Sequence, residues 1–165
     1  MKSHIVMFIC PNHDGRSQIA AALANALYVP LITAESAALT PRTPHPTAIN
    51  VMREIGLDIA RIPPRTIART MMRHPNFDSV IALSREAHDF PLPNNLIYQS
   101  RWLWDCPPIT PDGMDAMELL DHIRRLRDGI LGQILSWGDN IGLPPRADVS
   151  GPLLERAMHM AALGE

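Results

Sequence analysis

One stretch sets the architecture of this chain: Ile5-Val6-Met7-Phe8-Ile9-Cys10-Pro11-Asn12-His13-Asp14-Gly15-Arg16-Ser17-Gln18-Ile19-Ala20. Its first part is a run of apolar residues that ends at Cys10, and its last part begins a segment of helical period rich in alanine and leucine. We therefore expect a buried strand over residues 4–10, a short loop, and a helix over residues 17–28. This order of elements delivers Cys10 to a loop from which a helix leaves at once.

The loop after Cys10 has the features of an anion-binding site. A strand-to-helix loop points backbone N–H groups into one concavity, and the helix N-terminus adds the positive end of its dipole. Five residues separate Cys10 from Arg16, whose guanidinium offers a fork of donors to a tetrahedral oxyanion. The dipole, Arg16 and the Ser17 hydroxyl are expected to lower the pKa of the Cys10 thiol. The pattern predicts a thiolate nucleophile beside an oxyanion-binding loop.

This predicted loop consists of Pro11, Asn12, His13, Asp14, Gly15, Arg16 and Ser17. A second interpretation of the same pattern is a core cysteine at a strand end, followed by a serine that caps the helix. A strand before the cysteine and a helix directly after the serine favour the nucleophile, because they supply the structural context that the motif requires.

Composition narrows the function classes. The chain has 165 residues, of which 46% are hydrophobic and 19% charged, as in an ordinary globular domain. A formal net charge of −2 gives no electrostatic case for binding nucleic acid or an anionic membrane surface. With two cysteines and no recognisable export signal, the chain is expected to be cytoplasmic and reduced.

The loop segment resembles the active-site loop of the low-molecular-weight protein tyrosine phosphatases and of the related thioredoxin-coupled arsenate reductases. Their loop usually reads Cys-x-Gly-Asn-x-Cys/Ile-Arg-Ser, and the continuation Arg-Ser-Gln-Ile-Ala at residues 16–20 is nearer to the arsenate reductases. The string from Pro44 to Ile59 is also similar to a segment of the arsenate reductase branch. The resemblance covers residues 4–138 and implies a phosphatase-like α/β fold. That fold is a three-layer sandwich with a four-stranded parallel sheet and helices on both faces.

The alternation of apolar runs and helical segments independently predicts a parallel α/β sheet. Further strands are expected at 31–36, 77–83 and 95–99, and further helices at 46–55, 65–73, 114–137 and 151–163. Asp112 is the expected N-cap of the helix at 114–137, and Gly138 is expected to end it. Arg124, Arg125 and Arg127 are expected on its solvated side. Residues 1–138 are predicted to form the phosphatase-like domain, and 139–165 a C-terminal extension with a short helix.

The stretch Arg101-Trp102-Leu103-Trp104-Asp105-Cys106-Pro107-Pro108 resembles the His-Trp-x-Phe-Asp-Asp-Pro loop of the same proteins. In both branches the aspartate directly before the proline overhangs the nucleophile. Here Cys106 occupies that position, so Asp105 is the candidate general acid, with a solvent-facing loop aspartate as the alternative. The segment Ser84 to Pro91 contains no cysteine, so the family's relay is absent and Cys106 is the candidate redox partner of Cys10. His45 is expected to be a structural loop histidine.

Three functional hypotheses follow from these residues. The first is hydrolysis of a phosphate monoester through a phosphocysteine on Cys10, with a phosphotyrosine protein as the family's default substrate. The second is arsenate reduction by Cys10 with Cys106 or an external thiol, for which thioredoxin or another thiol donor would be the partner. The third is a catalytically weak domain that binds phosphate, sulfate or arsenate, because Asp14 places a negative charge in the loop, which a protonated His13 could offset. None of the three requires a metal or a bound cofactor.

Overall fold

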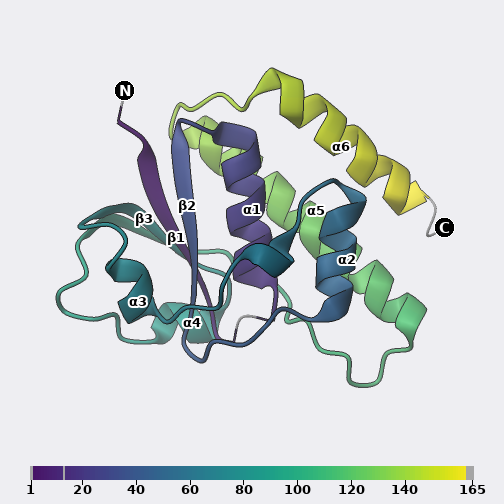
Figure 1. Ribbon diagram of the computed structural model, residues 1–165, viewed down its shortest axis with the longest axis horizontal. Coiled ribbons are helices and arrows are strands. Elements are labelled where there is room, and N and C mark those ends of the chain that lie inside the picture. Colours follow the sequence, from purple (N-terminus) through teal and green to yellow (C-terminus); the bar gives the residue numbers. More distant parts are fainter. Residues whose placement is uncertain (1, 13, 163–165) are drawn as a thin grey trace.

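The computed structural model describes residues 2–12 and 14–162 (Figure 1). The strands are β1 (His4–Cys10), β2 (Ile32–Ala38), β3 (Phe77–Ala82) and β4 (Tyr98–Leu103). The helices are α1 (Arg16–Tyr28), α2 (Pro46–Glu54), α3 (Ile67–Met71), α4 (Arg85–Asp89), α5 (Ala116–Asn140) and α6 (Ala147–Ala162), with a 3₁₀ turn, η1 (Ile59–Arg61). His13 of the predicted loop lies outside the described residues.

The four strands form one sheet in the order β2-β1-β3-β4, and every neighbouring pair is parallel. Helices α1, α2, α5 and α6 lie on one side of this sheet, whereas α3 and α4 lie on the other (Figure 1). The predicted three-layer α/β fold with a four-stranded parallel sheet is therefore confirmed.

The central strand β1 supplies both faces of the core, because successive side chains of a strand point to opposite sides. Val6, Phe8 and Cys10 belong to the buried cluster beneath α1 and α5, whereas Met7 and Ile9 belong to the cluster beneath α3 and α4. All five side chains are at most 1% exposed. Cys10 thus reaches the carboxyl end of the sheet with its side chain on the α1 side, where open α/β sheets place their sites.

Strand β4 differs from its expected position at 95–99. It runs from Tyr98 to Leu103 and is an edge strand, paired with β3 alone, so several of its side chains remain exposed. Such a strand lacks the apolar run by which the others are recognised. The first three residues of the segment expected as a loop, 101–103, are therefore strand, and the loop itself begins at Trp104.

Helix α5 begins and ends later than expected. Its N-cap is Asp115, not Asp112, because Asp115 accepts a hydrogen bond from the Glu118 amide at 2.9 Å while the Glu118 carboxylate accepts one from the Asp115 amide at 3.0 Å. Gly138 does not end the helix, which continues to Asn140. The glycine with a positive φ of 73° is Gly142, two residues beyond the last helical residue.

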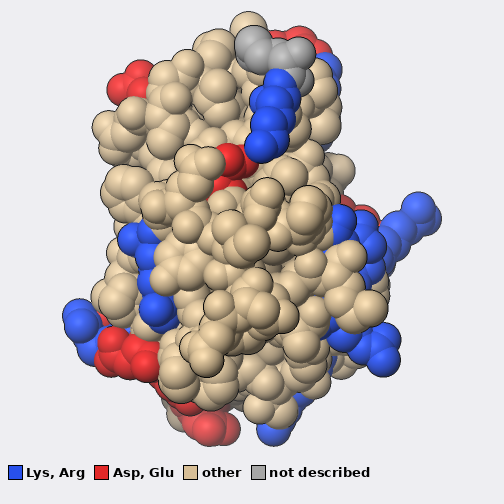
Figure 2. All heavy atoms as spheres, turned by 90° about the vertical axis from the view of Figure 1, so that its left-hand side faces the viewer, with Lys and Arg blue, Asp and Glu red and all other residues tan. Residues whose placement is uncertain are grey.

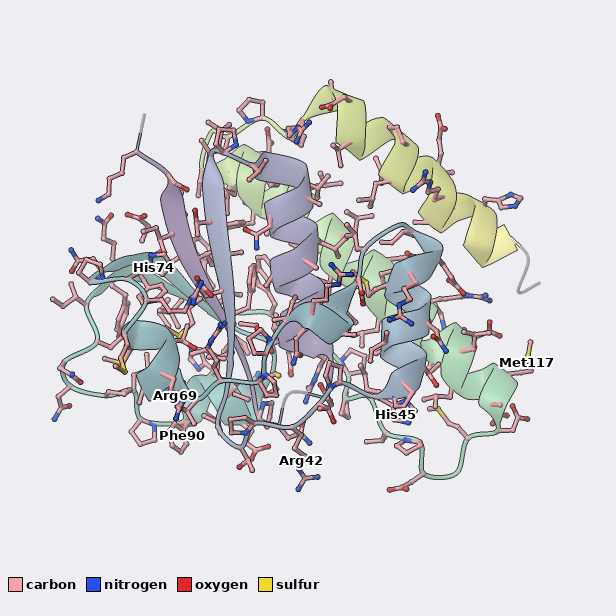
Figure 3. All side chains as sticks on the ribbon, in the orientation of Figure 1. Arg42, His45, Arg69, His74, Phe90 and Met117 are labelled. Atoms are coloured by element: carbon pink, nitrogen blue, oxygen red, sulfur yellow. The ribbon has the colours of Figure 1, made fainter. Side chains whose placement is uncertain are left out.

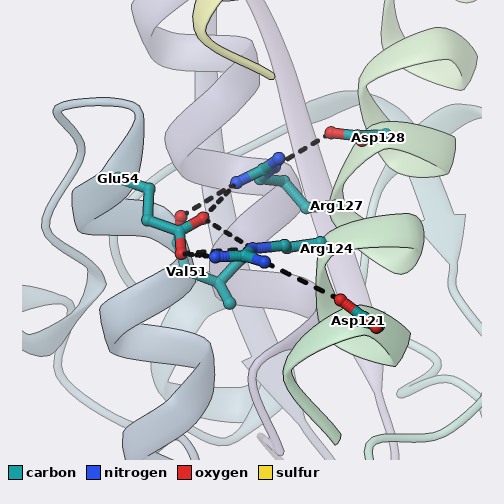
Figure 4. Close-up of polar contacts among 6 residues, drawn as sticks. All are labelled: Val51, Glu54, Asp121, Arg124, Arg127 and Asp128. Atoms are coloured by element: carbon teal, nitrogen blue, oxygen red, sulfur yellow. Dashed lines mark hydrogen bonds and ion pairs between the residues drawn. The ribbon is translucent and has the colours of Figure 1, made fainter. Parts of the chain in front are cut away.

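The prediction that the arginines of α5 face water is wrong for two of the three. Arg127 is 0% exposed, and its Nη1 donates to the Glu54 carboxylate at 3.1 Å and to the Val51 carbonyl at 3.1 Å. Arg124 donates to the same carboxylate at 2.8 Å (Figure 4). These pairs tie α5 to α2, while Arg125 is exposed as expected. A helix period alone does not reveal such pairing, because the partner carboxylate lies 70 or more residues away.

The arginine-rich stretch at 65–73 forms a shorter helix than expected, and its charges are mostly paired. Arg73 and His74 each approach the Glu35 carboxylate at 2.9 Å, and Arg65 approaches it at 3.9 Å. Arg69, on α3, faces solvent, as Figure 3 shows, and Arg73 stays 47% exposed despite its contact with Glu35. Most of the basic side chains of this stretch therefore pair with a single carboxylate, that of Glu35 on β2.

On the face seen in Figure 2, Lys and Arg are scattered around the edges and at one place in the upper middle, and the central area is uncharged, so no extended basic area is visible. In residues 2–12 and 14–162, no helix is both long and apolar enough to span a bilayer. Helix α6 packs back onto the domain, because Leu153 and Ala157 are each 4% exposed within the cluster beneath α1 and α5.

Candidate active site

Cys10 is held by its position between β1 and α1. Its side chain is 0% exposed, and the Sγ atom donates a hydrogen bond to Oγ of Ser17 at 3.1 Å. Ser17 lies in the first turn of α1 and is also 0% exposed. The strand end and the helix start thus bring together the two residues that the sequence motif paired.

The loop between them depends on Gly15. This residue precedes α1 with φ at +133°, and a Cβ built there would lie 3.0 Å from Cβ of Ala48 and 3.1 Å from Cδ1 of Ile109. Both the backbone conformation and the space require glycine. The Gly15 carbonyl accepts the first helical bond, from the Ile19 amide at 2.8 Å.

The segment after β2 braces the other half of the loop. The Leu39 amide donates to the Cys10 carbonyl at 3.3 Å, and the Thr40 amide donates to the Pro11 carbonyl at 2.8 Å. Arg42 extends outward from this segment, at the end of the molecule where β1 and β2 finish (Figure 3). The buried Oδ1 of Asn12 has no hydrogen-bond partner among the described residues. The loop therefore contains a buried acceptor that no described residue uses.

Asp14 turns inward and binds Arg16. Its Oδ1 accepts hydrogen bonds from Nε of Arg16 at 3.1 Å and from the Arg16 amide at 3.2 Å. Its Oδ2 accepts one from the Ile109 amide at 3.1 Å. The Arg16 side chain is 4% exposed and that of Asp14 9%. The negative charge that the sequence placed in the loop is thus neutralised by the arginine that was expected to serve the oxyanion.

Arg16 also contacts the second cysteine. Its Nη1 donates to the Cys106 carbonyl at 3.3 Å, and the Cys106 amide donates to the Leu83 carbonyl at 3.1 Å. Cys106 is partly buried against the cluster that contains Cys10, and both residues are free thiols. The structure therefore brings Cys10, Arg16 and the loop of Cys106 into one site.

The environment of the two thiols opposes ionisation. Burial raises the pKa of Cys10, and the charge of Asp14 adds to the rise, whereas the Ser17 hydrogen bond and the charge of Arg16 lower it. The prediction of a lowered pKa at Cys10 is wrong, because burial outweighs Ser17 and Arg16. The pKa of Cys106 is raised to about 11, mainly by burial and to a lesser extent by the charges of Asp105 and Asp14, while the charge of Arg16 acts in the opposite direction.

Asp105 lies apart from the buried centre of the site. It is exposed and lines a hollow between its own loop and α5, together with Cys106, His122 and Arg125. Among the residues that the structure describes, no hydrogen bond or ion pair joins it to Cys10, Arg16 or Ser17. Its role as a general acid remains a prediction.

His45 has the structural role that its sequence context predicted. It is the N-cap of α2, and its Nδ1 accepts a hydrogen bond from the Thr47 amide at 3.1 Å. Sequence reasoning missed the backbone groups of Ile109 and Cys106, which hold Asp14 and Arg16. No side-chain pattern marks them, because only their main-chain atoms take part.

Comparison of the sequence with known proteins finds a matching protein family and a curated relative. Residues 5–95 match the profile of the family described as low molecular weight phosphotyrosine protein phosphatase. The glutaredoxin arsenate reductase of Synechocystis sp. is 42% identical over 55 residues, which make up 33% of this chain and 42% of that protein. The match thus spans less than half the length of that curated relative.

Solved structures share the fold over most of the chain. An arsenate reductase in the phosphate binding state has a TM-score of 0.68 at 27% identity, covering 84% of this chain and 99% of that one. The thioredoxin-dependent arsenate reductase of Corynebacterium glutamicum has a TM-score of 0.61 at 26% identity, covering 84% and 62%. A low molecular weight protein tyrosine phosphatase from T. tengcongensis has a TM-score of 0.62 at 18% identity, covering 84% and 99%, which shows the shared fold alone.

The family profile covers more than half of the 165 residues and includes the loop from Cys10 to Ser17. Its match agrees with the parallel sheet and with the buried cysteine at the end of β1. The chain therefore belongs to the low molecular weight phosphotyrosine protein phosphatase family.

Proposed function

We propose that this chain is a cysteine-dependent enzyme acting on a tetrahedral oxyanion, and that its reaction is the reduction of arsenate. The observation that carries the proposal is that Arg16, the neighbour of the Ser17 that contacts Cys10 Sγ, also contacts the loop of Cys106. Its Nη1 contacts the Cys106 carbonyl at 3.3 Å, and its charge lowers the pKa of both thiols. One guanidinium is thus placed to hold an oxyanion at Cys10 beside a second thiol.

The proposed reaction balances with two thiols. The Cys10 thiolate attacks As(V), and an arsenate oxygen leaves as water after protonation. The thiolate of Cys106, or an external thiol, then attacks Sγ of Cys10 and breaks the sulfur–arsenic bond. The electron pair of that bond remains on arsenic, which leaves as arsenite, while the two thiols become a disulfide. A dithiol or glutathione-type donor then reduces the disulfide.

Two further facts support arsenate over a phosphate ester. Relatives named as arsenate reductases align at 26–27% identity over 84% of the chain. The candidate leaving-group acid, Asp105, is exposed on the α5 side. Arsenate reduction needs no acid for an organic leaving group, so it makes less demand on Asp105. The free thiols fit a reducing compartment such as the cytoplasm, which we propose as its location.

Arsenite production from arsenate tests the proposal. We expect turnover with thioredoxin, or with glutathione and glutaredoxin, and its loss in Cys10→Ser. The Cys106→Ser variant separates the two routes: lost turnover identifies Cys106 as the resolving thiol, and retained turnover identifies the external thiol. Absence of arsenite with every donor, from a folded protein, would contradict the proposal.

Hydrolysis of a phosphate monoester, with a phosphoprotein as substrate, is the second candidate. The match to the phosphatase family profile favours it. In this reaction Cys10 attacks phosphorus, Asp105 protonates the leaving oxygen, and water cleaves the phosphocysteine. Turnover of p-nitrophenyl phosphate that falls in both Cys10→Ser and Asp105→Asn would support it. Phosphate binding without arsenate reduction and without hydrolysis of p-nitrophenyl phosphate would indicate that the chain is an oxyanion-binding domain and not an enzyme.

A further inference from the structure

We propose that the hollow between α5 and the loop after β4 binds the thiol that reduces the enzyme, and that this thiol is a small molecule carrying carboxylate groups, of the glutathione type. Cys106 is the cysteine with which it exchanges. This inference rests on the proposed function, because it names the donor of that reaction and the place where the donor binds. A protein donor such as thioredoxin is the alternative.

The two cysteines differ in how far a reagent in solvent can reach them. Cys10 is 0% exposed in the cluster beneath α1 and α5. Cys106 is partly exposed and lines the hollow. Its main chain is fixed, since its amide donates to the Leu83 carbonyl at 3.1 Å and its carbonyl accepts from Nη1 of Arg16 at 3.3 Å. A thiol arriving from solvent therefore meets Cys106 first.

The size of the hollow suits a small molecule. Its volume is about 340 Å³, which lies in the range of about 300–1,000 Å³ that is usual for pockets binding small ligands. A protein partner instead contacts roughly 20–30 residues on each side of a standard interface. An arsenate ion would leave most of this volume unfilled. The size of the hollow therefore favours a donor as large as a short peptide over both the oxyanion and a protein.

The lining of the hollow carries one charge of each sign. Arg125 lies on α5 and Asp105 on the loop after β4, and both are exposed. Within residues 2–12 and 14–162, neither side chain forms an ion pair. The other two arginines of α5, Arg124 and Arg127, are both bound to Glu54. Arg125 is therefore the arginine of α5 that remains available to a carboxylate, whose two oxygens match its fork of donors.

The remaining lining is complementary to the rest of such a molecule. Leu126 and Ile130 are 4% and 1% exposed and supply an apolar surface for methylene groups. His122 is held at the hollow by its Nε2 atom, which lies 2.9 Å from the Pro108 carbonyl. A thiol peptide of the glutathione type has two carboxylates, one ammonium group and short methylene segments. Its carboxylate would bind Arg125, and its ammonium group would face the opposite charge of Asp105.

The exchange on Cys106 balances with two donor molecules. The thiolate of the first donor attacks Sγ of Cys106 in the Cys10–Cys106 disulfide, and the sulfur–sulfur bond breaks. Its electron pair leaves with Cys10, which takes up a proton, and Cys106 is held in a mixed disulfide with the donor. The thiolate of a second donor attacks the donor sulfur of that mixed disulfide and releases Cys106. The two donors are oxidised to their own disulfide, and both cysteines return to thiols.

S-Methylglutathione keeps the charges of glutathione but cannot exchange, so it tests binding alone. We expect the amide chemical shifts of Gly129 and Gln133, which line the hollow, to move to saturation when ¹⁵N-labelled protein is titrated with it. Arg125→Gln should weaken binding about tenfold, as for a lost hydrogen bond to a charged group. Arg85→Gln changes an exposed arginine of α4, on the other side of the sheet, and should leave the dissociation constant unchanged.

Oxidised glutathione identifies the sulfur that exchanges. Incubated with the Cys10→Ser variant, it should form a mixed disulfide on Cys106, which mass spectrometry of the digested protein locates. Under the same conditions Cys106→Ser should leave Cys10 unmodified. Adding Arg125→Gln to Cys10→Ser should slow formation of the mixed disulfide about tenfold at low glutathione concentration, whereas adding Arg85→Gln should not.

The outcomes separate this inference from the proposed function. Absence of saturable binding by the native chain, or an unchanged affinity in Arg125→Gln, would overturn the small-thiol site. A mixed disulfide on Cys10 in Cys106→Ser would also overturn it. Arsenite production supported by thioredoxin would stand in each of these cases, so the oxyanion site would remain. Saturable binding with no arsenite from any donor would overturn the proposed reaction and the role of the thiol as its reductant.

Discussion

The thiol of Cys10 donates a hydrogen bond to Oγ of Ser17 at 3.1 Å, in a core where both side chains are 0% exposed. When the thiol ionises, the hydroxyl must turn and donate to the thiolate. That bond lowers the pKa of Cys10 and is the largest influence opposing burial. Ser17 is therefore the residue on which formation of a thiolate in this site depends most.

We predict that Ser17→Ala raises the pKa of Cys10 further and slows the reaction at neutral pH about ten- to a hundredfold, as expected for the loss of a hydrogen bond to a charged group. Ultraviolet absorbance of the thiolate against pH, in a Cys106→Ser background, measures the change at Cys10 alone. Ser79→Ala, a buried serine of β3, is the control. An unmoved or lower midpoint in Ser17→Ala would contradict the prediction.

The opposite shift is expected at Asp14. Its charge raises the pKa of Cys10 and of Cys106, so Asp14→Asn should lower both and allow each thiolate to form at a lower pH. The same absorbance titration applies, with Cys106→Ser and Cys10→Ser backgrounds to isolate each thiol. Asp112→Asn should leave both midpoints in place. A rise at either cysteine would show that the variant rearranges the loop and does more than remove a charge.

The Glu54 carboxylate pairs with two arginines of α5, the fully buried Arg127 and the partly buried Arg124 (Figure 4). Glu54→Gln removes one of the two carboxylates that pair with Arg127, since Asp128 stays on its Nε at 2.9 Å. We expect it to lower the free energy of unfolding by about 1.5–3 kcal/mol, as for the loss of charge-assisted hydrogen bonds to a buried arginine. Urea denaturation measures this loss. Asp148→Asn breaks the exposed pair with Arg146 and should leave the unfolding midpoint nearly unchanged. Similar midpoints for the two variants would contradict the prediction.

The parts of the fold that sequence reasoning predicted are those with a local signal. Strand β1 is an apolar run, α1 follows a glycine, and Cys10 with Ser17 lies where the motif places them. What it missed depends on partners distant in the chain. Arg127 is buried because Glu54 lies opposite, and β4 is a strand because β3 pairs with it.

The electrostatics of the site also could not be predicted in full from the sequence. The motif correctly indicated which groups lower the pKa of Cys10, namely Ser17 and Arg16. It did not indicate how deeply the thiol is buried, or that Arg16 is shared with Asp14 and the Cys106 carbonyl. These quantities depend on the packing of α1 against the loop after β4, which no spacing of residue types records.

Gly138, inside α5, is expected to be essential for packing. A Cβ at this position would collide with the hydroxyl and ring of Tyr28, which is 0% exposed and donates to the Ile134 carbonyl at 3.4 Å. We predict that Gly138→Ala lowers stability by about 1–3 kcal/mol through overpacking. Gly132→Ala, in the same helix and with open space at its Cβ, should raise stability by about 0.5–1 kcal/mol. Thermal denaturation of both variants checks the opposite signs; a gain in Gly138→Ala would contradict the packing described.

Helix α6 offers a test of whether the C-terminal segment is part of the folded domain. Leu153 is 4% exposed in the cluster beneath α1 and α5, whereas its neighbour Leu154 is 37% exposed. We predict that Leu153→Ala costs about 2–4 kcal/mol, because it opens a cavity in that cluster. Leu154→Ala has the same effect on helix propensity but removes less buried surface, so it should cost well under half as much.

Urea denaturation of the two leucine variants measures this difference, and near-ultraviolet circular dichroism reports whether the environment of Trp137, 3% exposed in the same cluster, changes with it. A lower free energy of unfolding in Leu153→Ala, with a single cooperative transition, would mean that α6 unfolds together with the sheet. Equal and small costs at both positions would mean that α6 is not part of the cooperative core. The segment after α5 would then unfold separately from the sheet, with a boundary beyond Asn140 and not at the expected residue 138.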